Sequence, residues 1–142
     1  MMRVPSPIPV FLLLICCGGC GNPSRTVATV TPDQATVQPG GTVTLVGSLR
    51  GDEAHPALAW WIEESKELNS KNTCGKLDTA PKDFTGCPFG FVMYHPEFTI
   101  ASTATYFAPQ TPGTYHVVVT FGWLSYADWV ETTATASIVV TP

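Results

Sequence analysis

The chain is poor in charged residues. Asp, Glu, Lys and Arg make up 13% of its 142 residues, and none of them occurs between positions 98 and 127. The formal net charge is −4, so the chain lacks the basic character that a nucleic-acid partner requires. It also lacks an apolar run approaching the roughly 20 residues that cross a bilayer as a helix. These absences argue against a nucleic-acid-binding protein and against a helical membrane span.

The sequence also lacks a recognisable set of catalytic residues. His55, His95 and His116 are scattered, without Ser, Cys or Asp at motif spacing. Glu63 and Glu64 are adjacent, and neighbours on a strand point to opposite faces, so we expect a solvated strand end there. No nucleophile elbow, P-loop or clustered metal motif is present. We therefore expect a protein that is not an enzyme and that uses no cofactor or metal.

The first 20 residues have the layout of an export signal. Arg3 precedes an apolar run at 9–17, and Gly18 and Gly19 then lead to Cys20. A small-residue processing site after such a run is typical of exported proteins, and here it ends in a thiol. An ordinary secretory signal with incidental cysteines is the alternative, but no A-x-A-like site lies nearby.

This segment resembles the signal and lipobox of bacterial lipoproteins, in which the cysteine is acylated and becomes the first mature residue. The resemblance implies a signal peptide at 1–19, a lipidated tether at 20–25 beginning with Cys20, and a folded domain at 26–142. Acyl chains on Cys20 would hold the protein in a membrane of the cell envelope. Because Gly21 and not Asp follows the cysteine, the resemblance favours the outer membrane where a host has two.

Two cysteines, Cys74 and Cys87, lie beyond the signal and Cys20. An even pair of thiols in an exported protein is most simply one disulfide. By the chain-entropy argument, closing this loop stabilises the fold by about 3 kcal/mol. A metal site that combines the two cysteines with His95 and His116 is the alternative, although the spacing matches no familiar zinc pattern.

The mature chain favours β structure throughout. Short alternating segments rich in Thr, Val, Tyr and Trp recur between Gly and Pro turn signals, which predicts a β-sandwich or barrel. Strands are expected at 26–31, 35–37, 42–49, 57–63, 89–94, 98–101, 103–107, 115–121 and 133–141. Residues 65–97 break the rhythm and are interpreted as a disulfide-stapled insertion. A loop is expected at 122–131.

Four stretches together resemble bacterial immunoglobulin-like domains: residues 31–44, 60–61, 106–120 and 136–141. The resemblance implies an all-β, immunoglobulin-like sandwich of about seven strands. It places one of Trp60 and Trp61 in the core, and it gives Tyr115 the role of a buried ring whose hydroxyl bonds to upstream backbone. Val117 stands where antibody-type domains have a cysteine, and we expect aliphatic packing against Leu45 in place of the bridge.

The segment 121–129 is unusually aromatic for a connection. One interpretation is an exposed platform of Trp123, Tyr126 and Trp129, on which sugar rings or an apolar anchor of a partner stack. The alternative is that these rings fold back and cover the end of the sandwich. We accordingly expect a membrane-anchored structural or protein-interaction module of the cell envelope. The second hypothesis is a carbohydrate-binding or adhesion protein that uses this segment, so the expected partners are a membrane and an envelope protein or a glycan.

Overall fold

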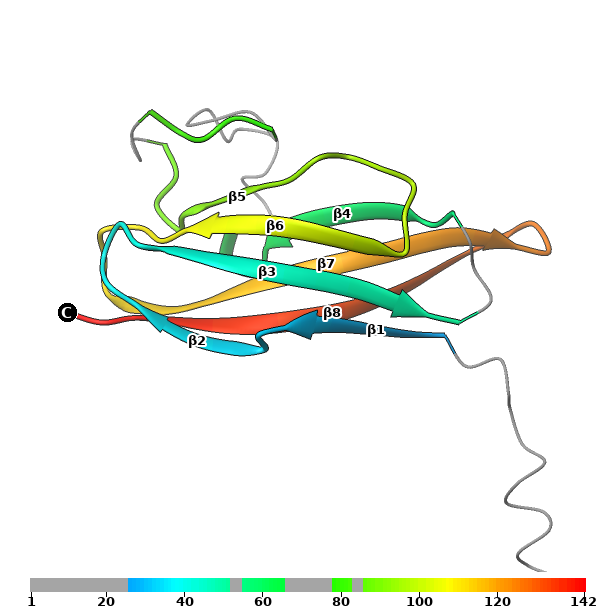
Figure 1. Cartoon of the computed structure of the whole chain (residues 1–142), viewed down its shortest axis with the longest axis horizontal. Helices are drawn as coiled ribbons and strands as arrows, with labels where there is room; N and C mark the ends of the chain where they lie inside the picture. Colours follow the sequence, from blue (N-terminus) through cyan, green and yellow to red (C-terminus); the bar gives the residue numbers. More distant parts are fainter. Residues whose placement is uncertain (1–25, 52–54, 66–77, 83–85) are drawn as a thin grey trace, which may run out of the picture.

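The computed structural model describes residues 26–51, 55–65, 78–82 and 86–142. Within these ranges the chain forms two four-stranded β-sheets with a single short 3₁₀ helix (Figure 1). This confirms the predicted all-β sandwich, with eight strands where the sequence predicts about seven. The elements are β1 (Val27–Thr31), β2 (Gln34–Val37), β3 (Thr42–Arg50), β4 (Ala57–Ile62), η2 (Glu63–Ser65), β5 (Phe91–Met93), β6 (Ala101–Phe107), β7 (Gly113–Ser125) and β8 (Asp128–Val140).

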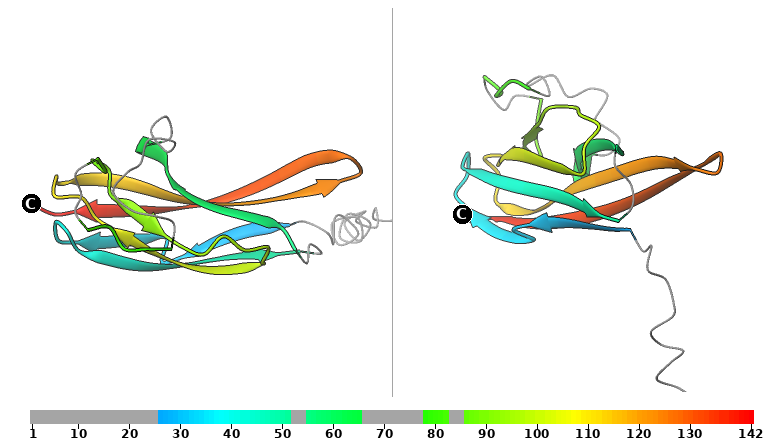
Figure 2. Two further views of the ribbon diagram at one scale, coloured as in Figure 1. Left: turned by 90° about the horizontal axis from the view of Figure 1, so that it is seen from above. Right: turned by 45° about the vertical axis from the view of Figure 1, so that its right-hand side comes forward.

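The strand order is β1-β3-β6-β5 in one sheet and β2-β8-β7-β4 in the other. Every pair is antiparallel except β2 with β8, which run parallel over Gln34–Val37 and Ser137–Val140. The chain therefore enters the first sheet with β1 and crosses at once to the second with β2. Figure 2 shows the two sheets as layers, and one cluster of buried side chains from both sheets fills the space between them.

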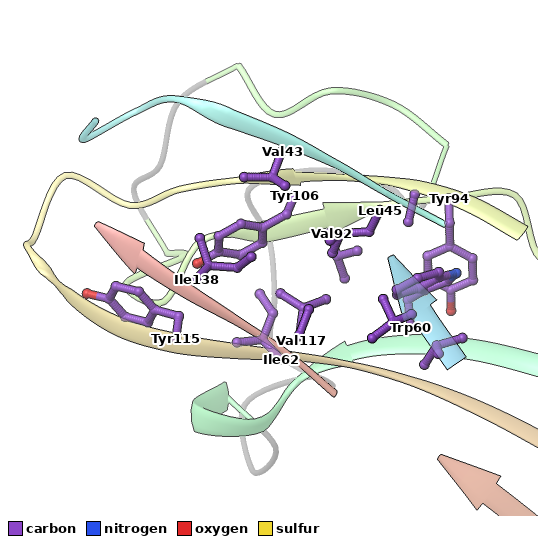
Figure 3. Close-up of a cluster of buried hydrophobic side chains, with 14 of the residues drawn as sticks. Val43, Leu45, Trp60, Ile62, Val92, Tyr94, Tyr106, Tyr115, Val117 and Ile138 are labelled. Atoms are coloured by element: carbon purple, nitrogen blue, oxygen red, sulfur yellow. The ribbon is translucent and has the colours of Figure 1, made fainter. Parts of the chain in front are cut away.

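The core follows the two-residue alternation of the strands. Along β3, Val43, Leu45 and Leu49 are buried while the intervening threonines are exposed, as expected for a strand with one face on the core. The residues predicted for the core all lie in it (Figure 3), with exposed fractions of 3% for Trp60, 7% for Tyr115, and 0% for Leu45 and Val117. Trp60 is the buried member of the tryptophan pair, because alternation turns Trp61 to the outer face.

The Trp60 indole is fixed by contacts with the opposite sheet. Its Nε1 donates a hydrogen bond of 3.0 Å to the Ser102 hydroxyl on β6. The ring covers Gly47 of β3, where a Cβ atom would lie 2.8 Å from Trp60 Cζ2 and 3.0 Å from Val119 Cγ2. Gly47 therefore provides the space that lets the largest side chain type lie flat between the sheets.

Two buried tyrosines, Tyr115 and Tyr106, bond to backbone carbonyl groups in the part of the core away from Trp60. The Tyr115 hydroxyl donates to the Thr111 carbonyl oxygen at 2.8 Å, four residues upstream, and its ring lies 6.4 Å from that of Phe89. Tyr106 is fully buried, and its hydroxyl donates to the Phe89 carbonyl oxygen at 2.8 Å. Burial raises the pKa of Tyr106 well above its usual value, and burial also raises the pKa of Tyr115.

The prediction of a loop at 122–131 is wrong. Strands β7 and β8 continue through this stretch as a hairpin paired from Gly113↔Val140 to Ser125↔Asp128. Only Tyr126 and Ala127 form the turn, and their positive φ values of 53° and 81° are those of a type I′ turn. The hairpin extends past the rest of its sheet, because β4 ends its pairing with β7 at Gly122 (Figure 1).

The predicted insertion at 65–97 contains part of a sheet. Its strand β5 pairs with β6 over Phe91–Met93, so the predicted strand at 89–94 is present but shorter. The strand expected at 103–107 is present as β6, which begins at Ala101. The separate strand expected at 98–101 is not formed, because Phe98 makes only an isolated bridge with Ala57. Cys87 is buried, with 3% of its surface exposed. Its expected partner Cys74 and the lipidation site Cys20 lie outside the described residues, so both assignments stay predictions.

Candidate functional site

The rings of the segment 121–129 do not share one face. Because β7 and β8 are strands here, successive side chains alternate between the core and the outer surface. Phe121 is fully buried, and Trp123 is partly buried against the core and pairs with Val130. Trp129 lies on the outer face opposite Leu124, with 55% of its surface exposed. The predicted platform therefore loses Trp123, which belongs to the inner face of the hairpin.

Tyr126 occupies the tip of the hairpin and is fully exposed. It is one of the two turn residues, so its backbone geometry directs it away from both faces of the sheet. The single platform predicted from the sequence is thus divided among three places. Trp123 covers the core, Trp129 lies on the outer face and Tyr126 is at the tip.

The Trp129 indole lies flat over the backbone of β7. A Cβ atom built on Gly122 would lie 2.2 Å from Trp129 Cζ2, so the ring occupies the space above this glycine. Its Nε1 donates a hydrogen bond of 2.7 Å to a carboxylate oxygen of Glu131, two residues along β8. The bond fixes the ring orientation and leaves an exposed, flat aromatic surface with an acidic group at its edge.

A second tryptophan reaches the same strand from the other side. Trp61 of β4 donates from Nε1 to the Thr120 hydroxyl oxygen at 2.9 Å. Thr120 and Gly122 are two residues apart on β7, so they point to the same face about 7 Å from each other. We call Trp61, Thr120, Gly122, Trp129 and Glu131 the outer tryptophan site. Trp61 was not predicted to belong to such a site, although two adjacent tryptophans on a strand must face opposite ways.

A shallow hollow of about 120 Å³ lies beside the Trp129 ring. It is bordered by Ala57, Leu58 and Ala59 of β4 and by Thr120, Gly122, Trp129 and Glu131 of the hairpin. A larger hollow of about 320 Å³ runs along the junction of β2 and β8, and neither an aromatic nor a charged side chain lines it. Of these two hollows, the smaller combines a flat ring, a hydroxyl and a carboxylate, which are groups that recognise a small polar ligand.

Glu64 and His116 form a contact that the sequence did not predict. Glu64 was expected at a solvated strand end, but its carboxylate accepts hydrogen bonds of 3.0 and 3.1 Å from the His116 backbone N–H. One carboxylate oxygen also lies 2.5 Å from His116 Nδ1. The last backbone pair of β4 with β7 is Ile62↔Val117, so the carboxylate supplies an acceptor just past the end of β4. We therefore interpret the contact between Glu64 and His116 as one that stabilises the edge of the sheet.

Among the residues that the structure describes, no three His, Cys, Asp or Glu side chains gather in a way that could hold a metal ion. The alternative metal site would require Cys74, which lies outside these residues. Within the same ranges no helix has the length and apolar character needed to cross a membrane. Comparison of the sequence with protein-family models and with curated proteins gives no match.

Proposed function

We propose that this chain is a non-enzymatic immunoglobulin-like module, held at a membrane of the cell envelope by lipid on Cys20. The observation that carries the domain type is the strand order. The sheets β1-β3-β6-β5 and β4-β7-β8 match the A-B-E-D and C-F-G sheets of immunoglobulin domains, in that order along the chain. Strand β2 then extends the second sheet by parallel pairing with β8.

Details of the core support the same domain type. Trp60 lies on the strand that corresponds to C, where immunoglobulin domains have their buried tryptophan. The bond from the Tyr115 hydroxyl to the Thr111 carbonyl has the form of a tyrosine corner near the start of the strand that corresponds to F. Leu45 and Val117 are both fully buried where antibody domains have their cysteines, which favours aliphatic packing in place of a bridge.

The envelope location and the disulfide rest on the sequence. Arg3, the apolar run and the glycines before Cys20 support export and acylation, and the outer membrane is favoured where there are two. The even number of cysteines beyond the signal of an exported chain supports the pairing of Cys87 with Cys74. The role we propose is that of a structural or protein-interaction module, for which exposed aromatic rings supply typical contact residues.

A second candidate function, saccharide binding, is favoured by the outer tryptophan site. The apolar C–H face of a sugar ring stacks on a flat indole, and its hydroxyls bond to acceptors beside the ring. Trp129 offers the indole, and Glu131 and Thr120 offer oxygen atoms around the hollow. Of the three rings in the original hypothesis, Trp123, Tyr126 and Trp129, this second candidate function rests on Trp129.

Intact-mass measurement of protein extracted from membranes tests the main proposal. We expect a mature chain that begins at Cys20 and carries acyl groups. Reduction should increase its mass by one hydrogen atom for each of the two cysteines of the disulfide. Protein that salt alone releases from membranes, or a chain without acyl mass, contradicts the anchor. An unchanged mass after reduction contradicts the disulfide.

Affinity electrophoresis in gels that contain envelope polysaccharide tests the second candidate. Trp129→Ala should abolish retardation, whereas Val139→Ala, an exposed substitution on β8 away from the site, should leave it intact. If the wild-type chain runs unretarded in every gel, saccharide binding is rejected and the protein-interaction role remains. Melting temperatures of both variants show whether the fold is preserved.

A further inference from the structure

The exposed apolar side chains are gathered at one end of the sandwich. Nine large apolar side chains among the described residues are exposed, and seven of them lie where β1 begins. One of the seven is Val27, the first residue of β1. We call the other six the apolar end: Phe98, Ile100, Leu124, Tyr126, Trp129 and Val130. The remaining two, Val46 and Val139, lie on β3 and near the end of β8.

Strand pairing shows that these residues share one end although they come from separate segments. Val27 pairs with Arg50 at the end of β3, and Ala57 at the start of β4 forms pairs with both Gly122 and Phe98. The hairpin continues beyond Gly122 to its tip. Figures 1 and 2 show this tip and the start of β1 at the same end of the molecule, with the C-terminus at the opposite end.

The exposure at this end is large for a soluble surface. Tyr126 is 100% exposed, Phe98 73% and Leu124 70%. Large exposed apolar patches mark sites that contact other molecules or membranes. Tyr and Trp are also the residues that proteins place at the boundary between lipid and water, where a ring lies among apolar groups and its polar atom stays wet.

The chain length between the proposed anchor and the domain limits how far this end lies from the lipid. Cys20 precedes Thr26 by six residues, and six residues span at most about 20 Å. Beyond Gly122 the three residues to Ser125 carry the hairpin about 10 Å further, at the end of the sandwich where β1 begins (Figure 1). The hairpin extension is therefore about half the maximum span of the tether. If the tether spans less than this half, the hairpin tip reaches the lipid surface.

We propose that the apolar end lies against the lipid layer that carries the anchor, with the hairpin tip in the interfacial region. This rests on the proposed lipidation of Cys20. The anchor holds the end close to the lipid, and proximity of this kind makes weak contacts effective. The module then stands upright on the membrane, with its C-terminal end directed away.

Charge determines which lipid surface fits. The charged residues described at this end are Arg50 at the end of β3, Glu97 beside Phe98, and Asp128 and Glu131 on the hairpin, so acidic groups outnumber basic ones. An acidic tip gains nothing from anionic lipids, so the contact depends on apolar and aromatic insertion and persists at high salt. The surface that fits is accordingly zwitterionic.

Fluorescence quenching by lipid tests the contact. The acylated chain carrying Trp129→Phe and Tyr126→Trp has an indole at the tip, and the matched control carries Trp129→Phe and Val139→Trp, with the new indole at the other end. Each is reconstituted into phosphatidylcholine vesicles with and without bromine on the acyl chains near the headgroups. Both variants retain Trp60, Trp61 and Trp123, so the measured quantity is the difference between them. We expect brominated lipid to cause a larger loss of fluorescence for the variant with the tip indole than for the control.

Flotation of the same vesicles separates the two proposals. Protein that floats and shows equal emission in both kinds of vesicle retains its anchor and overturns the membrane contact. This is the result expected if the apolar end binds a partner protein or a glycan instead. Protein that does not float overturns the anchor, and the membrane contact falls with it. Quenching that disappears in high salt contradicts the proposed apolar origin of the contact.

Discussion

Substitution of Gly47 by alanine tests how the Trp60 indole packs between the sheets. The added Cβ would lie 2.8 Å from Trp60 Cζ2 and 3.0 Å from Val119 Cγ2, so at least one side chain must shift. Overpacking of this kind costs about 1–3 kcal/mol. The φ of Gly47 is not positive, so alanine fits the backbone and recovers about 0.5–1 kcal/mol of the entropy that glycine loses in a strand. We expect a net loss of about 1–2 kcal/mol in the free energy of unfolding.

Thermal unfolding followed by circular dichroism measures this loss. For a domain of this size a loss of about 1–2 kcal/mol lowers Tm by about 4–8 °C. The control is Val46→Ala, a neighbouring position of β3 that is exposed. Trp60→Phe in the Gly47→Ala background should recover part of the loss relative to Trp60→Phe alone, because a smaller ring leaves room for the methyl group. A Tm that rises in Gly47→Ala, or strict additivity of the two changes, refutes the packing described.

Two further predictions concern ionisable groups. Glu64→Gln should lower the free energy of unfolding by about 1–2 kcal/mol, because a charged acceptor with two oxygens becomes a neutral amide with one acceptor oxygen for His116. Urea unfolding measures this, and Glu63→Gln at the exposed neighbour should change nothing. The raised pKa of Tyr106 is caused first by burial and then by Tyr115 and Glu64, so folding favours the protonated phenol. Its stabilising effect is complete below the ordinary tyrosine pKa of 10.0 and is lost as the pH rises above it, so Tm should fall there. Tyr106→Phe should make this fall shallower, and an equal slope in both proteins contradicts the assignment.

Alternation along single strands made much of the fold predictable. Val43 and Leu45 repeat every second residue between threonines, and this pattern alone indicates which face is buried. The tryptophan pair on β4 left open which ring is buried. The choice of Trp60 depends on Gly47 and Ser102, which lie on the opposite sheet and far away in the sequence.

The hairpin was missed because its local signals favour a loop. Gly122 weakens a strand, and the turn residues Tyr126 and Ala127 are not the Asn-Gly or Asp-Gly typical of a type I′ turn. The structure compensates by covering Gly122 with the Trp129 ring, a contact that forms only once β7 and β8 pair as a hairpin. The same misreading placed Trp123 and Trp129 together, since only the alternation of a strand separates them.

The contact between Glu64 and His116 has a consequence for assembly. Past the end of β4, the backbone N–H of His116 is the next donor that β7 directs to this side of the sheet among the described residues. The carboxylate already occupies this donor, and its charge repels the carbonyl groups of another chain. Exposed sheet margins are templates for aggregation, and proteins often blunt them with charged side chains. Glu64 thus disfavours pairing between the sheet edges of neighbouring copies of this chain where the protein is concentrated.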